Sequence, residues 1–515
     1  MMRNKLHSKI ILLLLFSLLW IQYSTSTNYY FDSRWGKNDN SGISSTSPLR
    51  SLYMIKRIVI KPGDSILLKS GDVFLEPLCI SAKGANNQPI VIGKYGGDKK
   101  PYLKGDGSYL EMVHVYNSEN IVIRDLEISN KGLKPRPYLS GLLVDLHNYG
   151  KAKNILITNL YIHDIYGSLY KGDGYNNKEV GAGQAIMLQS VSGNGPDSIP
   201  SCFDGLTVKN CYIKDSQRNG IMMWGNWIRK YWFPSTHIII EHNIIDGVPG
   251  DGIVPVGCEA PLIQYNIIKN CPKTLPPTEA CDGIWPWSCD NAVIQYNIVS
   301  DQNSQVDGYG FDSDYNCTNS LFQYNLSFNN AGGFLLLCNS GGWPQEFSIG
   351  NRGTIVSYNI SINDGIRQYI VKGMSKFFSP IIHITGPTEN SKIEHNIIYT
   401  KKKRLNDMDK RIICSDNWSG YSDSTYFENN YIYVEEPTKA FDKSKATNNF
   451  FKGNLFVGPL LTPNIGFQAY HGKFDKKMWY SPKDPHWRNM IEFVKNISIP
   501  INGKMRKVLD IIGYN

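Results

Sequence analysis

The chain has 515 residues, of which 41% are hydrophobic and 19% are charged, and its formal net charge at pH 7 is +9. This length allows several domains or one long repeat array. The one dense basic run, residues 401–404, is typical of a solvated loop, so the charge pattern argues against a nucleic-acid-binding protein. An acidic substrate is compatible with this mild charge but is not required by it.

The first 26 residues have the pattern of a secretory signal peptide. Arg3, Lys5 and Lys9 form a basic start, residues 10–21 are apolar, and residues 24–26 are small enough for cleavage. The apolar run is too short for a good membrane span, and no second long apolar stretch follows. The sequence therefore predicts a secreted or periplasmic protein without a transmembrane segment.

Residues 27–110 contain short β-rich stretches separated by turn residues, and residues 111–460 contain a repeat in which an Asn is followed by alternating apolar residues. The repeat places its Asn at Asn159, Asn210, Asn243, Asn266, Asn297, Asn325, Asn359, Asn396, Asn430 and Asn454. Short strands that recur once per irregular turn predict an all-β solenoid, a parallel β-helix, because a propeller would keep a steadier period of ~40–50 residues. We expect residues 27–110 to form an N-terminal cap and the first coils, and residues 111–460 to form the catalytic β-helix.

The repeated Asn is predicted to be structural. An Asn at the same bend of every coil can adopt the left-handed conformation, and its amide can bond to the Asn of the next coil. We therefore expect a ladder of amides inside the solenoid and not a row of ligands.

Ten Cys residues occur in the chain, and four of them, Cys202, Cys258, Cys289 and Cys317, share one position of the repeat. This regularity favours an internal stack of free, buried thiols, although an exported protein could also pair them as disulfides. The spacing does not resemble a zinc-binding pattern. Residues 461–515 hold Trp479 and Trp487 and a possible helix near residues 489–495, which we interpret as a C-terminal cap or packing arm.

Several stretches near the start resemble the amino-terminal cap of secreted right-handed parallel β-helix proteins of the pectate-lyase-like superfamily. They lie at residues 29–33, 38–42, 47–52, 61–66, 89–92 and 101–105. The resemblance covers roughly residues 28–460 and implies a right-handed solenoid that acts on polysaccharides, as a lyase or a glycoside hydrolase. The Trp-Ile-Asp-His signature of classical pectate lyases is absent, as are the Gly-His-Gly and Arg-Ile-Lys elements of polygalacturonases, so no catalytic residue is carried over.

Four stretches can be aligned with one another, at residues 251–256, 282–287, 309–314 and 332–337. Because alternate residues of a strand face opposite sides, the alignment predicts that Ile253, Ile284, Phe311, Phe334 and Ile366 point inward. It predicts one outward column of Met222, Val254, Trp285, Asp312, Leu335 and Arg367. It predicts a second outward column of Trp224, Val256, Trp287, Asp314, Leu337 and Tyr369.

Asp312 and Asp314 are the predicted catalytic residues, with Asp307 as a third candidate, because they interrupt columns that are otherwise aromatic or aliphatic. Crowding of these three carboxylates should raise at least one pKa and supply a protonated acid. Outward positions two residues apart lie ~6.5–7 Å apart, which is nearer the ~6.5–9.5 Å of inverting glycosidases than the ~5–5.5 Å of retaining ones. We therefore predict an inverting glycoside hydrolase that acts on a polysaccharide or oligosaccharide, as a monomer and without a metal or other cofactor.

The substrate-binding prediction has two parts. Trp285, Trp287 and Trp224 would offer apolar faces to sugar rings, although the first two could instead pack under a loop. The remaining candidates are Asp251, Asp282, Arg367 and Tyr369, of which the two Asp residues precede Gly and could simply form turns, while Arg367 could be a surface charge. Variable loops at residues 167–183 and 271–280 are expected to shape specificity.

Two other functions stay open at the level of sequence. A Ca²⁺-assisted polysaccharide lyase could bind the ion through Asp307, Asp312 and Asp314. It would also need a base, for which Arg218, His242, Arg367, Tyr369 and Lys372 are the candidates. The third possibility is a non-catalytic solenoid that binds glycans.

Overall fold

The computed structural model describes residues 26–175, 177–192, 197–371, 377–400, 409–443, 445–459, 461 and 467–470. The predicted signal peptide and nearly all of the predicted C-terminal arm lie outside these residues, so both stay predictions, as does the secreted or periplasmic location. In the described part of the chain, no helix is long and apolar enough to cross a membrane.

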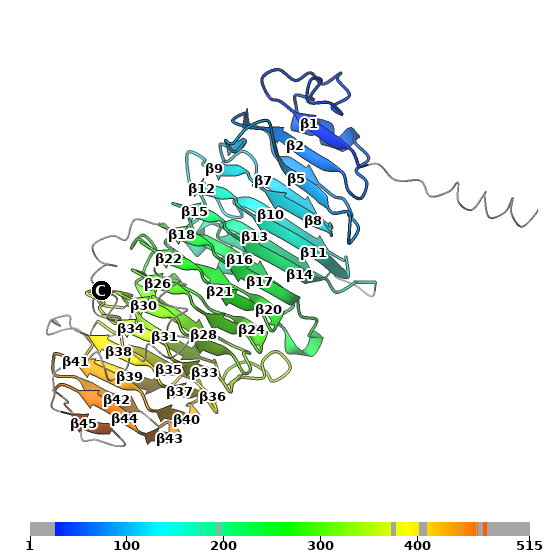
Figure 1. Ribbon diagram of the computed structural model, residues 1–515. Helices are drawn as coiled ribbons and strands as arrows, with labels where there is room; N and C mark the ends of the chain where they lie inside the picture. The colour runs from blue at the N-terminus through cyan, green and yellow to red at the C-terminus, as the bar shows by residue number, and fades with distance from the viewer. Residues whose placement is uncertain are drawn as a thin grey trace, which may run out of the picture.

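The described chain winds into a stack of coils that extends from β1 at one end to β45 at the other (Figure 1). Each full coil contributes one strand to each of three parallel sheets, which we call sheets A, B and C. Pairing between coils is parallel throughout the strands, for example Leu206 with Ile238 in sheet A and Ile213 with Ile245 in sheet B. This confirms the predicted parallel β-helix.

Sheet A contains β1 (Asn28–Phe31), β2 (Ser65–Lys69), β5 (Ile90–Tyr95), β8 (Ile121–Arg124), β11 (Lys151–Thr158), β14 (Cys202–Lys209), β17 (Thr236–Glu241), β21 (Leu262–Gln264), β25 (Val293–Gln295), β29 (Leu321–Gln323), β33 (Ile355–Ser357), β37 (Lys392–Glu394), β40 (Asp423–Glu428), β36 (Thr388–Glu389), β32 (Asn351–Arg352) and β43 (Thr447–Lys452). Sheet B contains β3 (Val73–Phe74), β6 (Tyr102–Gly105), β9 (Glu127–Asn130), β12 (Tyr161–Ile165), β15 (Tyr212–Lys214), β18 (Ile244–Asp246), β22 (Ile267–Lys269), β26 (Ile298–Ser300), β30 (Leu326–Phe328), β34 (Ile360–Ile362), β38 (Ile397–Thr400), β41 (Tyr431–Val434), β44 (Asn454–Val457) and β45 (Phe467–Tyr470).

Sheet C is formed in two runs joined by single bridges at Ile284. The first run contains β4 (Leu78–Ile80), β7 (Glu111–Tyr116), β10 (Ser140–His147), β13 (Gln184–Val191), β16 (Asn219–Trp224) and β19 (Ile253–Val254), and the second contains β28 (Tyr309–Ser313), β31 (Gly333–Cys338), β35 (Ile382–Thr385), β39 (Arg411–Asp416) and β42 (Lys439–Lys443). Two short pairs flank the bridged region, β20 (Val256–Glu259) with β24 (Trp287–Asp290) and β23 (Ala280–Cys281) with β27 (Val306–Asp307). The described helices are short: η1 (Leu52–Arg57), η2 (Lys171–Asp173), α2 (Lys178–Gly181) and η3 (Arg229–Tyr231).

A ladder of Asn side chains connects the coils, as predicted. The amide of Asn297 donates to Asn325 Oδ1 at 3.1 Å, and the same bond recurs between coils from Asn243 to Asn454. The predicted left-handed conformation is wrong for these residues, because the preceding residue adopts it, as Tyr296 does with φ 55°. Asn159 and Asn210 have φ 54° and occupy that preceding position, so they were aligned one residue out of place.

The cysteines are free, as predicted, and all ten are among the described residues. Nine of them are buried and Cys79 in β4 is exposed. Cys258 pairs with Cys289 on the next coil, and the backbone N–H of Thr318, which follows Cys317, donates to the Cys289 carbonyl. The predicted stack therefore exists for Cys258, Cys289 and Cys317, but Cys202 does not share their position, because Ser235 bridges to Cys258 and Thr236 pairs with Asp204. No described cysteine forms a disulfide.

Candidate active site

The outward face of sheet C carries the residues that the alignment predicted up to Asp314. Ile253, Ile284 and Phe311 are fully buried in the core and are bridged to one another in that order. Their outward neighbours Val254, Trp285 and Asp312 therefore form the first column. Val256, Trp287 and Asp314 form the second, since Val256 pairs with Trp287 and the N–H of Asp314 bonds to the Pro286 carbonyl.

Beyond Asp314 the predicted columns are wrong by one residue. Phe311 pairs with Leu335, so Leu335 and Leu337 face the core while Leu336 and Cys338 face outward. The alignment placed Gly332 opposite Tyr309, whereas Gly333 pairs with Tyr309, so each later residue of the strand is displaced by one position. A slip of one residue exchanges the two faces of a strand, which explains the error.

Arg367 and Tyr369 lie on neither column, which corrects their predicted position. Ile366, predicted to point inward from a strand, is half-buried and lies outside the strands of sheet C. The guanidinium of Arg367 is buried and donates to the backbone carbonyls of Ser304, Gln305 and Asp307. The Tyr369 hydroxyl donates to the Ser304 carbonyl on the same segment. Both side chains thus fix the segment that presents Asp307.

A pocket of about 340 Å³ opens over the two columns, and the side chains of Asp282, Asp307, Asp312 and Asp314 all line it. Asp312 is only 3% exposed and Asp282 is buried, whereas Asp307 and Asp314 are half-buried. Among these four predicted carboxylates, Asp307 and Asp314 are therefore the two that a ligand in the pocket can contact most directly.

The crowding prediction is confirmed in direction, but burial is the main cause. Burial raises the pKa of Asp312 well above its usual value, and the neighbouring Asp314 adds to the effect. Burial also raises the pKa of Asp314, to about 7, although hydrogen bonds from the Cys338 thiol and the Tyr315 N–H oppose it. The pKa of Asp307 is raised by burial, against the attraction of Lys178 and Arg367.

Cys338 connects the two predicted catalytic residues. Its sulfur lies 2.9 Å from Asp314 Oδ1 and 3.8 Å from Asp312 Oδ1. The three possible ligand atoms of this group lie within 4.8 Å of one another, so the carboxylates converge more closely than the ~6.5–7 Å expected from their strand positions. Burial raises the pKa of the Cys338 thiol well above its usual value, so the thiol stays protonated and donates to Asp314.

This contact predicts a pH effect for Cys338→Ala. Because the thiol hydrogen bond lowers the pKa of Asp314, its removal should raise that pKa above about 7. If Asp314 acts as a carboxylate, the acidic limb of the kcat/KM profile should move to higher pH, since activity requires the ionised form. Cys338→Ser keeps a hydroxyl donor and should keep the wild-type limb. A limb that stays in place in Cys338→Ala would contradict the assignment.

Asp251 and Asp282 form a second ladder at the start of the sheet C strands. Asn219 Oδ1 accepts from the Asp251 N–H at 3.0 Å, and Asp251 Oδ1 accepts from the Asp282 N–H at 3.1 Å. Asp282 Oδ1 in turn accepts from the Tyr309 N–H. Both side chains therefore stabilise the turns at the start of successive sheet C strands. Of the two residues, Asp282 also lines the pocket, whereas Asp251 does not.

Lys178 from α2 covers this ladder and was not found from the sequence, although loop 167–183 was expected to contribute. Its ammonium lies 3.2 Å from Asp251 Oδ2 and 4.9 Å from the centre of the Trp285 ring. Burial alone would lower the pKa of Lys178, but Asp251 and Glu179 raise it above its usual value. A permanent positive charge therefore lies at the acidic end of the pocket.

Trp285 and Trp287 do not form an exposed platform, which corrects one predicted reading. They are 3% and 9% exposed, and they pack with Trp224 and Trp227 in an aromatic cluster outside the core. The Trp285 indole N–H donates to Asp251 Oδ1 at 2.9 Å. Both rings nevertheless line the pocket, whereas Trp224 does not line it and contacts Trp287 edge to face, with 5.4 Å between the ring centres.

The pocket extends to residues on later coils that sequence reasoning missed. Leu336 pairs with His383 and Cys338 with Thr385, and both partners line the pocket. Tyr315 and Trp418 add aromatic side chains with their ring centres 5.1 Å apart. The correct register would have identified His383, but Trp418 lies beyond the last residue of β39 and no strand pattern indicates it.

The proposed Ca²⁺ ligands and lyase bases fit poorly. Ca²⁺ prefers six to eight oxygen ligands, whereas Asp312 and Asp314 converge on a thiol. Arg218 is fully buried and paired with Glu279 at 3.2 Å, and His242 stacks on Tyr265. Arg367 and Tyr369 bind backbone carbonyls, and Lys372 lies outside the described residues.

Comparisons with known proteins agree with the fold. The family described as "Right handed beta helix region" matches residues 175–351. The chain is 26% identical to a lacto-N-biosidase of Bifidobacterium longum subsp. longum, over 91% of this chain but only 32% of that protein. The chain thus spans about a third of the length of this curated relative.

Two crystal structures of a GH136 lacto-N-biosidase from Eubacterium ramulus are also similar. The selenomethionine derivative is 25% identical with a TM-score of 0.60, over 79% of this chain and 68% of that one. The native protein is 24% identical with a TM-score of 0.59, over 78% and 68%. This chain is therefore a right-handed parallel β-helix protein, similar over most of its length to lacto-N-biosidases.

Proposed function

We propose that this protein is a glycoside hydrolase that cleaves a neutral oligosaccharide or polysaccharide. The observation that carries the proposal is the pair of half-buried carboxylates, Asp307 and Asp314, that face one pocket beside Trp285 and Trp287. Glycosidases use two carboxyl groups on either side of the bond that they cleave. The similarity to lacto-N-biosidases supports the same class of reaction.

Hydrogen bonding separates the roles of the two carboxylates. Asp314 Oδ1 accepts from the Tyr315 N–H at 2.7 Å and from the Cys338 thiol, and both donors favour the charged form. Among the described residues, no hydrogen-bond donor reaches the Asp307 carboxylate. Asp314 therefore acts as the carboxylate and Asp307 as the acid, while burial and the charge of Asp314 favour the protonated form of Asp312.

The predicted inverting course loses its support in this arrangement. It was inferred from the spacing of Asp312 and Asp314, whose nearest oxygens lie within 4.8 Å, below the ~6.5–9.5 Å of an inverting pair. Inversion is therefore not part of the proposal. NMR of the first product anomer, before it equilibrates in water, measures the course directly.

The charge of the pocket favours a neutral sugar over a uronate. Four Asp residues and Glu179 line it, against the single ammonium of Lys178. The ammonium is already paired with Asp251, so it does not offer a free cation to the carboxylate that a lyase substrate must carry. The lyase alternative consequently has no observation in its favour, and the non-catalytic alternative does not account for two carboxylates with raised pKa values in one pocket.

A product assay tests the proposal. The protein is incubated with p-nitrophenyl lacto-N-bioside and with neutral and uronic-acid polysaccharides, and the products are identified by mass spectrometry. We expect new reducing ends or released p-nitrophenol from a neutral substrate. Unsaturated uronides would instead establish a lyase, and binding without products would establish a glycan-binding solenoid. Size-exclusion chromatography of the same sample tests the predicted monomer.

A further inference from the structure

The outward columns of sheet C continue for two coils past the outward residues Leu336 and Cys338. His383 and Thr385 come next, and Cys414 and Asp416 follow on β39. Neighbouring coils lie ~4.8 Å apart, so His383 lies roughly 10 Å along the stack from Asp312. The pocket therefore has a second polar end, on the opposite side of the carboxylates from Trp285.

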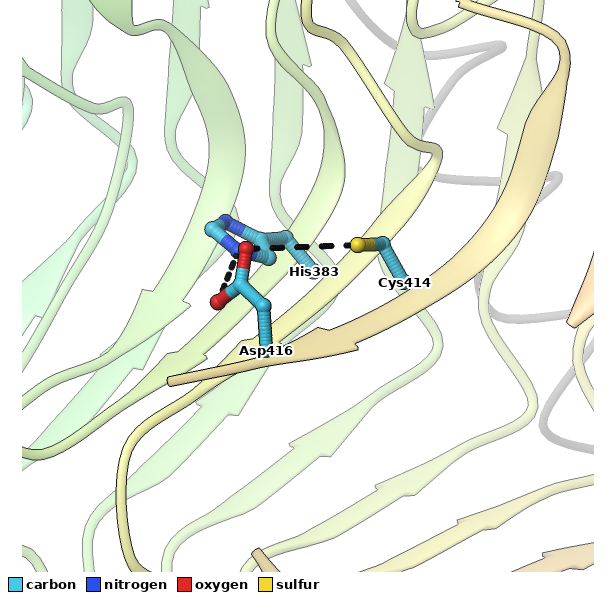
Figure 2. A group of neighbouring side chains, drawn as sticks. All are labelled: His383, Cys414 and Asp416. Carbon is cyan, nitrogen blue, oxygen red and sulfur yellow. Dashed lines mark hydrogen bonds and ion pairs between the residues drawn. The ribbon is translucent and has the colours of Figure 1, made fainter. Parts of the chain in front are cut away.

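His383 and Asp416 form a hydrogen-bonded pair at this end. His383 Nε2 lies 3.1 Å from Asp416 Oδ1, and Figure 2 shows the two side chains meeting above the strands. Burial raises the pKa of Asp416, but the hydrogen bond and charge of His383 outweigh it, so the pKa lies below its usual value. Asp416 does not line the pocket itself, but it is ionised, its side chain is 34% exposed beside the pocket-lining His383, and it can accept hydrogen bonds from sugar hydroxyls.

Trp418 supplies an aromatic face beside this pair. It lines the pocket, is 39% exposed and contacts the Tyr315 ring. Sites for small polar ligands commonly combine aromatic surface with a few placed hydrogen-bonding groups. An exposed indole can pack on the apolar C–H face of a sugar while the neighbouring carboxylate binds hydroxyls on its edge.

The same group could in principle hold a metal, because the donor atoms of His383, Cys414 and Asp416 lie within 4.8 Å of one another. Two observations argue against metal binding. The Arg411 guanidinium lies 3.0 Å from the Cys414 sulfur, where its charge opposes a cation. Burial also raises the pKa of Cys414 to about 12, whereas a metal ligand must be a thiolate.

The charges here favour a neutral ligand. Arg411, which contacts Cys414, is already paired with Asp409 and Asp442. The carboxylates of Asp307, Asp312 and Asp314 lie on the adjacent side of the pocket. A sugar with its own carboxylate would be repelled from this end as well.

We infer that His383, Asp416 and Trp418 form a subsite for a neutral sugar unit on the C-terminal side of the carboxylates. This inference rests on the proposed glycoside hydrolase function and extends it, because it places substrate on both sides of Asp314. His383 orients Asp416, Asp416 binds hydroxyls, and Trp418 packs on the ring.

The test is a binding measurement that does not depend on turnover. Asp314→Asn protein is titrated by calorimetry with a neutral tetrasaccharide ending in lacto-N-biose, with xylotetraose and with tetragalacturonate. We expect at least one neutral tetrasaccharide to bind and tetragalacturonate to bind more weakly. Adding Trp418→Ala or Asp416→Asn to this variant should lower its affinity for the neutral tetrasaccharide by at least about tenfold.

Trp343→Ala is the matched control. Trp343 is also 39% exposed and contacts Tyr315, but it does not line the pocket, so its loss should change affinity by less than about twofold. The subsite is overturned if neither neutral tetrasaccharide binds, if tetragalacturonate binds best, or if Trp418→Ala and Asp416→Asn bind normally. If binding depends on Trp418 while wild-type protein hydrolyses nothing, the subsite stands and the hydrolase proposal fails.

Discussion

Replacing Asp314 by Asn is expected to lower kcat at least ~10³-fold, because the reaction would lose the carboxylate opposite the acid. Asp307→Asn should cause a loss of similar size. The amide matches the carboxylate in shape, so the melting temperature should remain within a few degrees of the wild-type value. Steady-state kinetics on the substrate identified by the product assay, together with thermal unfolding, checks both variants.

Asp312→Asn separates the two possible reacting pairs. The original alignment placed Asp312 and Asp314 together as catalytic residues, which predicts equal losses. The structure buries Asp312, at 3% exposed, and leaves Asp307 half-buried in the pocket. We therefore expect at most about a tenfold loss in Asp312→Asn, because the raised pKa of the buried Asp312 favours a neutral carboxyl group that an amide matches in shape and charge. Full activity in Asp307→Asn would end the assignment of the acid.

Asn297→Ala is expected to cost at least ~3 kcal/mol of local stability. The Asn297 amide donates to the Ile263 carbonyl and to Asn325, and its oxygen accepts two bonds from Asn266. Alanine removes all four of these bonds and takes away the acceptor of the buried Asn266 backbone N–H. Because solenoid repeats open locally, hydrogen exchange of the flanking coils is the measurement, supported by thermal unfolding.

Gln295→Ala provides the control for the ladder. Gln295 lies on the same coil and also bonds amide to amide, with Gln264 at 3.0 Å and Gln323 at 2.8 Å. It is half-buried, so water can replace the lost partners, and we expect a cost below ~1 kcal/mol. Equal costs in the two variants would show that burial does not set the strength of the ladder.

The spacing of the repeat was sufficient to predict the fold as a stack of coils. A buried Asn before each pair of apolar residues requires the same bend on every coil, and only stacked coils satisfy its amide. The residue that bends the chain was still misassigned, because Tyr296 accepts the left-handed conformation when its ring stacks on Tyr265 and Tyr324. Propensity alone favours Asn there, and stacking between coils overrides it.

The outward residues of the site were predicted correctly only up to Asp314, where the predicted strand register still matches the structure. Trp285, Trp287, Asp312 and Asp314 fall where the alignment placed them because no residue is inserted between Ile253 and Phe311 in sheet C. The alignment then placed Gly332 instead of Gly333 opposite Tyr309, which exchanged inward and outward faces and hid Cys338 and His383. A local pattern cannot reveal such a displacement, since both registers place apolar residues along the strand.

The alternation of residues along strands could not identify the site residues that come from loops. Lys178 lines the pocket and contacts Asp251, which lies 73 residues later in the sequence. Arg367 binds the backbone of the segment that contains Asp307. Their roles depend on how long loops fold back over sheet C. Sequence spacing could indicate which loops would matter, as for residues 167–183, but not which side chain each would deliver.

Nine buried thiols and one exposed thiol allow the unfolding of the solenoid to be followed by the accessibility of its cysteines. In the native protein, Cys79 is the site open to an alkylating reagent, and its position on β4 places a label at the N-terminal end of the stack. Unfolding would expose all ten. The stoichiometry of labelling would then count the buried thiols that have become accessible, and mass spectrometry of the modified peptides would identify the coils that hold them.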